Sequence, residues 1–301
     1  MLGSCLDRVR EASPLVHCIT NYVTVNDVAN AILAVGASPI MSDEPEEVTD
    51  ITAICDALDL NIGTLNRLTI EGMRRAGARA RELGHVVLLD PVGAGASPLR
   101  TRTALELLEL ARPDVVRGNA SEVRALALGT TSTHGVDAAA ADAVSEQNLD
   151  AMVEFAKGFA ADVHATVAIT GAIDLVADAG RCFVIRNGRP EMSRITGTGC
   201  QLSGVICAFV AAARAVAPAA GDVPAATTAA AVIPAPAAPP AEGDTTAAVA
   251  AAVACMGLAG EVGRAHLAPH EGNATLRNRI IDALSHLDGA ALDGGERYEL
   301  R

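Results

Sequence analysis

The sequence predicts an α/β fold in which helices cover both faces of a mostly parallel sheet. Short runs rich in Val, Ile and Leu alternate strictly with stretches of helical apolar spacing between residues 15 and 170. These runs, such as residues 86–89, are apolar at every position, which is typical of strands buried on both faces. Half of the 301 residues are hydrophobic, enough for a large core, so we treat residues 1–301 as a single domain.

The expected elements follow in order along the chain. The strands are expected at residues 15–20, 38–41, 60–63, 85–90, 114–117 and 165–170. The helices between them are expected at residues 24–35, 44–58, 64–83 with Thr64 as N-cap, 99–110, a segment after Asn119, and 147–161. Residues 169–176 and 181–186 are expected to form a hairpin or an edge pairing. Helical spacing resumes at 247–267 and 276–287.

Residues 194–203, RITGTGCQLS, precede the apolar run 205–210 and predict a loop that opens a buried helix. Gly197 and Gly199 allow a tight turn with several N–H groups directed at one spot, which attracts phosphate. The positive helix end is also expected to lower the pKa of Cys200 below the free value of about 8.5. The alternative is a chance Gly-x-Gly with an inert, packed cysteine. A P-loop is excluded, because Lys157, the single lysine, precedes a glycine.

Polar residues gather at the expected carboxyl ends of the strands, the edge at which parallel sheets bind ligands. They are Thr20, Asn21, Met41, Ser42, Asn61, Thr64, Asp90, Arg117, Asn119, Thr170 and Gly171. Asp90 and the flexible turn after it suit Mg²⁺ held through water, although Asp90 could simply cap the turn. Arg117 offers a guanidinium to phosphate, and Glu122 a carboxylate in the next helix; a surface salt bridge would explain both residues almost as well.

The composition excludes several classes of partner. A net charge of −13 and a pI near 4.9 argue against binding to nucleic acid or to an anionic membrane surface. The first residues show no export signal, so we expect a cytoplasmic protein. Seven cysteines without a C-x-x-C pair indicate reduced thiols. His266 and His270 stand four apart, but Pro269 between them disfavours a helical metal pair.

A composition shift marks residues 215–246, which are mostly Ala and Pro. A Pro-rich stretch neither continues a helix nor pairs in a central strand. We therefore expect a flexible surface insert here.

Together these segments resemble the hydroxyethylthiazole kinases of the ribokinase-like superfamily over nearly the whole chain. Seven stretches in the right order support the resemblance: residues 18–26, 37–41, 61–64, 89–95, 117–122, 169–171 and 197–200. The resemblance implies a three-layer α/β/α fold and a homotrimer whose substrate pocket lies at a subunit boundary. The insert departs from the family pattern and leaves the local loop structure open.

The resemblance also implies a reaction, the ATP-dependent phosphorylation of 4-methyl-5-(2-hydroxyethyl)thiazole in thiamine biosynthesis or salvage. Cys200 would be the catalytic residue, and Asp90 and Glu122 would lie near Mg²⁺, which they would hold through water. Residues expected at the thiazole are Met41, Gly197, Asn21, Asn26, Asn61 and Thr64, and those expected at ATP are Arg117, Thr170, Gly171, Thr198 and Gly199. Two alternatives stay open: a kinase for another small hydroxymethyl compound, such as a hydroxymethylpyrimidine, and a non-catalytic thiazole-binding protein.

Overall fold

The computed structural model describes residues 2–129, 143–215 and 243–301. Most of the expected insert at 215–246 lies outside these residues. Its last two residues, Thr245 and Thr246, are described, and they begin a helix rather than belonging to a loop.

Nine strands of the described residues form one sheet in the order β2-β1-β3-β4-β5-β6-β7-β8-β9. Their bounds are β1 Leu15–Ile19, β2 Ser38–Met41, β3 Ala57–Asn61, β4 Val86–Asp90, β5 Val115–Gly118, β6 Thr166–Ile169, β7 Asp174–Ala177, β8 Cys182–Ile185 and β9 Tyr298–Leu300. Neighbours from β2 to β6 are parallel, whereas β7, β8 and β9 add antiparallel pairs at one edge. The carboxyl ends of strands β1 to β6 therefore meet at one edge, as the alternation of strands and helices predicted.

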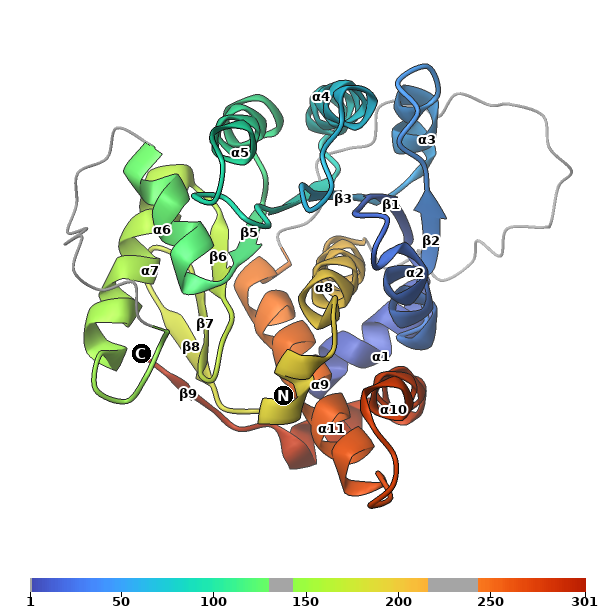
Figure 1. The fold of residues 1–301 in the computed structure, drawn as a ribbon, viewed down its shortest axis with the longest axis vertical. Helices are drawn as coiled ribbons and strands as arrows, with labels where there is room; N and C mark the ends of the chain where they lie inside the picture. The colour runs from blue at the N-terminus through green and yellow to red at the C-terminus, as the bar shows by residue number, and fades with distance from the viewer. Residues whose placement is uncertain (1, 130–142, 216–242) are drawn as a thin grey trace, which may run out of the picture.

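Helices cover both faces of the sheet and make a three-layer α/β/α fold (Figure 1). One face carries α3 Val48–Ile54, α4 Arg67–Leu83, α5 Pro98–Ala111, α6 Ala120–Gly129 and α7 Leu149–Val163. The other carries α1 Gly3–Ala12, α2 Val25–Ala34, α8 Thr198–Arg214, α9 Thr245–Ala265, α10 Asn273–His286 and α11 Gly289–Gly295. The expected fold class is confirmed.

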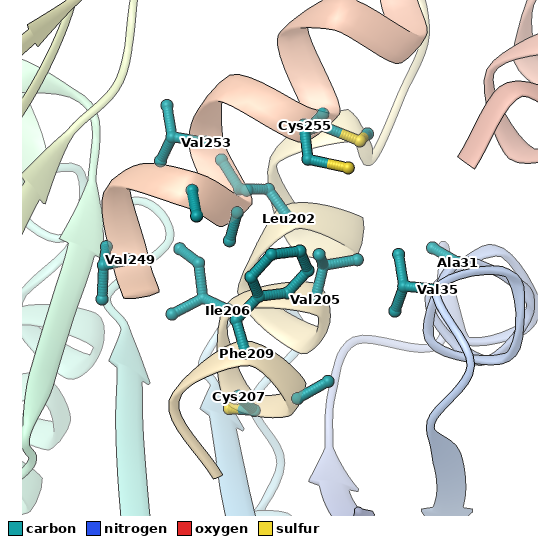
Figure 2. Packing of buried hydrophobic residues seen from close by; sticks show 14 of the residues in the cluster. Ala31, Val35, Leu202, Val205, Ile206, Cys207, Phe209, Val249, Val253 and Cys255 are labelled. Atoms are coloured by element: carbon teal, nitrogen blue, oxygen red, sulfur yellow. The ribbon is translucent and has the colours of Figure 1, made fainter. Parts of the chain in front are cut away.

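Helices α8 and α9 form the centre of the second layer. Every residue of α8 from Cys200 to Ala212 is buried, and such an all-round apolar helix requires neighbours on every side. Figure 2 shows Ile206 and Phe209 of α8 between Val249 of α9 and Val35 of α2. Helix α9 is long and apolar enough to cross a membrane, but 78% of its most apolar window is buried inside the protein. The first turn of α8 is thereby held rigidly over the strand ends.

Some expected boundaries were wrong. Strand β3 starts at Ala57, not residue 60, so α3 is shorter than expected. Helix α4 is capped by Asn66, whose side chain accepts hydrogen bonds from the amides of Leu68 and Thr69, and not by Thr64. Helix α1, helix α11 and strand β9 were not expected from the sequence. Strand β9 is held by pairing with β8, a contact between distant parts of the chain that local spacing does not reveal.

Candidate active site

A buried carboxylate lies at the middle of the strand ends. Asp90, the last residue of β4, has no exposed surface, and its Oδ2 accepts hydrogen bonds from Asn61 Nδ2 at 2.8 Å and Ser203 Oγ at 2.8 Å. Burial raises the pKa of Asp90, and the Arg117 charge opposes that rise. Its Oδ1 is buried and has no hydrogen-bond partner among the described residues. A buried carboxylate oxygen without a partner is a place where a ligand could bind.

Arg117, on β5, contacts both the Asp90 carboxylate and Thr170, the residue directly after β6. Its Nη1 lies 3.4 Å from Asp90 Oδ2, and its Nη2 donates to Thr170 Oγ1 at 2.7 Å. Glu122 is otherwise engaged: its two oxygens accept from the amides of Gly93 and Asn119, both at 2.8 Å. A salt bridge between Arg117 and Glu122 is therefore wrong. Arg117 instead presents a guanidinium beside a strand end, and Glu122 ties two neighbouring loops together.

The first turn of α8 approaches the guanidinium closely. Gly197 has a φ of 83°, and a Cβ added to it would lie 2.2 Å from Thr24 Cγ2. A Cβ at Gly199 would lie 2.6 Å from both terminal nitrogens of Arg117. The first helical hydrogen bond runs from the Gln201 amide to the Gly197 carbonyl at 2.9 Å, so the three preceding amides have no partner within the helix. Both glycines are needed for this turn, which can bind an anion between amides and Arg117.

Cys200 lies one step further along α8 and is nearly buried. Asn21 Nδ2 donates to its Sγ at 3.0 Å, and the same amide donates to Asn61 Oδ1 at 3.2 Å. The pKa of Cys200 is raised, first by burial and then by the negative charge of Asp90. The expected lowering of this pKa was wrong, because loss of hydration outweighs the helix end and Arg117. Cys200 is thus a neutral thiol at neutral pH.

The residues expected at ATP line one cavity of about 680 Å³. Arg117, Thr170, Gly171, Thr198 and Gly199 all border it, although they come from three separate parts of the chain. The rest of the wall is built by the β7 to β8 edge and by α9, and it includes Asp174, Asn187, Arg189, Met192 and Met256. The sequence did not single out these residues.

The residues expected at the thiazole divide into two groups. Asn21 and Asn61 join Cys200 and Asp90 in the buried network. Met41 is a partly buried residue at the end of edge strand β2, Asn26 is exposed on α2, and Thr64 accepts a hydrogen bond from the Tyr22 amide at 3.2 Å. Gly197 is the N-cap of α8 and lies against Thr24. The isolated chain therefore brings only part of this set together.

Sequence reasoning missed two residues of the network. Thr24 Oγ1 donates to Asn21 Oδ1 at 3.0 Å, and Ser203 donates to Asp90. Ser203 stands three residues after Cys200, which places both on one face of a helix and could have indicated it.

A divalent cation would find one suitable donor here. No group of three His, Cys, Asp or Glu side chains able to hold a metal is present among the described residues. Mg²⁺, however, is bound in kinases by one or two carboxylates together with water and substrate phosphates. The unpartnered Asp90 Oδ1 fits that donor set, whereas both oxygens of Glu122 already accept backbone amides.

Comparison with known proteins identifies the family. The family model described as the hydroxyethylthiazole kinase family matches residues 6–235. The chain belongs to the hydroxyethylthiazole kinase family. It is 48% identical over 299 residues to the hydroxyethylthiazole kinase of Clostridium acetobutylicum, covering 99% of each chain, and 41% identical over 298 residues to that of Methanoculleus marisnigri, covering 98% of this chain and 92% of that one.

Solved structures agree with this assignment. The structure of the hydroxyethylthiazole kinase protein from Pyrococcus horikoshii OT3 matches with a TM-score of 0.79 and 31% identity, over 100% of this chain and 98% of the other. A ribokinase-like superfamily protein from Enterococcus faecalis matches with a TM-score of 0.57 at 15% identity, over 96% and 94% of the two chains. The second match concerns the fold alone, and it confirms the expected ribokinase-like architecture of this hydroxyethylthiazole kinase family member.

Proposed function

We propose that the protein transfers the γ-phosphoryl group of ATP to the hydroxyl of 4-methyl-5-(2-hydroxyethyl)thiazole. The observation that carries the proposal lies at the first turn of α8. There the cavity wall that contains Arg117 and Gly199 adjoins the buried hydrogen-bond network of Cys200 and Asp90. Family membership supplies the substrate, and this geometry supplies a place where an alcohol and a phosphoryl group could meet.

The phosphate end of the cavity has the groups that phosphoryl transfer requires. Arg117, the free amides at Thr198 and Gly199, and the Thr170 hydroxyl would bind and neutralise phosphate oxygens. Asp90 Oδ1 would hold Mg²⁺, with Glu122 acting through water. Bound there, the cation would neutralise charge on the transferring group. The residues thus supply mainly positioning and electrostatic stabilisation, which is what this chemistry depends on.

Cys200 is assigned to the acceptor alcohol. Its Sγ is fixed by Asn21 and lies beside the α8 amides, so it can orient a hydroxyl toward the phosphates. Its raised pKa makes it a neutral thiol, which favours an orienting role over that of a standing base. A loose transition state for phosphoryl transfer does not need a strong base.

The thiazole ring is assigned to a pocket completed by a second copy of the chain. Within one chain, Asn26 is exposed on α2 and Met41 ends the edge strand β2, and two large side chains after β1, Tyr22 and Val23, are 78% and 58% exposed. A homotrimer with the pocket at its boundary would cover these side chains and gather the set. Sedimentation should then give three chains per particle, and a fully active monomer would contradict this assembly.

One assay tests the function. Coupled ADP release is measured with ATP and Mg²⁺ across a panel of small alcohols that includes the hydroxyethylthiazole and a hydroxymethylpyrimidine. The thiazole alcohol should give the highest kcat/KM, with little ADP released when no alcohol is present. A higher kcat/KM for the pyrimidine would favour that alternative, and thiazole binding without ADP release would indicate a binding protein.

A further inference from the structure

The cavity wall contains one carboxylate among its described residues, and the function proposed above does not use it. Asp174 is the first residue of β7 and borders the cavity together with Arg117, Thr170 and Gly171. A carboxylate repels phosphate, so Asp174 would suit a part of a bound nucleotide other than its phosphates.

The turn between β6 and β7 fixes the position of this carboxylate. The Gly171 amide donates to Asp174 Oδ1 at 2.8 Å, and Asp174 pairs across the sheet with Ile185, two residues before Asn187. Its Oδ2 has no hydrogen-bond partner within the described part of the chain. The side chain is half-buried, and burial raises its pKa to about 7. One oxygen of the fixed carboxylate thus lacks a donor, while the Gly171 amide and the Arg117 charge partly oppose the rise of its pKa.

The place of Asp174 along the cavity indicates which donors it would receive. Thr170 and Gly171 stand at the phosphate end, directly before the turn that holds Asp174. The same cavity wall also carries the apolar side chains of Met192, Val253 and Met256. In a nucleoside triphosphate the ribose lies between the phosphates and the base, and its hydroxyls are donors of the kind an ionised carboxylate accepts.

We propose that Asp174 accepts a hydrogen bond from a ribose hydroxyl of the bound nucleotide and makes the site select ribonucleotides over deoxyribonucleotides. This inference rests on the proposed use of ATP, but it does not depend on the identity of the acceptor alcohol. The base of the nucleotide would then contact the apolar side chains of the cavity wall.

The test compares ATP, 2′-deoxyATP, 3′-deoxyATP and ITP in the parent protein and in Asp174→Ala and Asp174→Asn. In the parent, kcat/KM for one deoxy nucleotide should be about ten- to a hundredfold lower than for ATP, the factor that a hydrogen bond to a charged group supplies. Asp174→Ala should lower kcat/KM for ATP by that factor and leave the deoxy nucleotide unchanged. For Asp174→Asn, which keeps one acceptor oxygen, kcat/KM for ATP should lie between the values of the parent and of Asp174→Ala.

Asp162→Asn serves as the control, since Asp162 is exposed and does not border this cavity. It should leave the selectivity unchanged. Equal use of ATP and both deoxy nucleotides by the parent would overturn the proposal, and so would equal losses for all nucleotides in Asp174→Ala. Loss of discrimination between ATP and ITP alone would assign Asp174 to the base instead and overturn it as well.

Calorimetric titration with ADP and 2′- and 3′-deoxyADP, without any alcohol, separates this inference from the proposed function. Selective binding that disappears in Asp174→Ala would uphold it even if the thiazole is not phosphorylated. Binding without selectivity would overturn it even if thiazole turnover is high.

Discussion

Gly197→Ala tests whether the close approach of Gly197 to Thr24 sets the position of the first turn of α8. The new Cβ would stand 2.2 Å from Thr24 Cγ2, where two carbon atoms normally keep about 3.5 to 4.0 Å. Alanine at the φ of 83° costs about 1–2 kcal/mol of folding free energy, and the overlap adds about 1–3 kcal/mol. We expect a total loss of about 2–5 kcal/mol. Turnover should also fall, because Thr24 holds Asn21, which holds Cys200.

Gly84→Ala is the matched control. Gly84 has a similar φ of 70°, but a Cβ there would meet no atom within 4 Å. It should therefore lose only the backbone part, about 1–2 kcal/mol, and keep full activity. Thr24→Ser added to Gly197→Ala removes the clashing Cγ2 and retains the hydroxyl, so it should restore part of the lost stability.

The free energy of unfolding is measured by urea titration, followed by far-ultraviolet circular dichroism because the chain has no Trp. Protein concentration is held equal across the variants, since assembly would otherwise shift the result. Equal losses for Gly197→Ala and Gly84→Ala would refute the reasoning from the Thr24 contact.

Four further predictions concern the same region and the insert. Cys200→Ser should lower kcat about tenfold or more and change thiazole affinity little, because an orienting role is felt in the transition state; an unchanged kcat would reject that role. Arg117→Ala should raise KM for ATP and leave thiazole affinity nearly unchanged, whereas equal effects on both ligands would indicate misfolding. Since burial raises the pKa of Cys200 in the folded chain above that of a free thiol, the thiol's contribution to stability is complete below the free pKa and declines as the pH rises above it. The melting temperature of the parent should therefore fall relative to Cys200→Ala above pH 9, and parallel curves would contradict the raised pKa. Replacing residues 218–242 by a short Gly/Ser link should preserve turnover and melting temperature, because Gly243 already lies against Ala213. Loss of activity or of the trimer would show that the insert is needed for catalysis or assembly.

The sequence predicted the sheet and most of its strands because local patterns record local physics. Apolar runs mark strands buried on both faces, and strict alternation with helices requires parallel neighbours. The polar residues at the strand ends, such as Asp90 and Arg117, could be collected for the same reason. The sequence did not predict helix α1 and strand β9, because partners far away in the sequence stabilise them.

The sequence did not predict the contacts within the site. It placed Asn61 and Asp90 at one edge of the sheet and Cys200 at a helix start, but it did not predict the hydrogen bonds that join Ser203 to Asp90 or Asn21 to Cys200. Nor did it distinguish Asp174 from other strand residues, because only the folded chain brings this carboxylate into one cavity wall with Arg117 and Thr170.

Cys200 shows the division most clearly. The sequence by itself determined that the Cys200 thiol follows a glycine turn at the start of a helix. From that local setting we expected a lowered pKa for Cys200. The tertiary structure decided otherwise, because it buries the thiol and places it near Asp90. A helix end acts over one turn and is encoded locally, whereas desolvation and the charge of a distant strand exist only once the chain has folded.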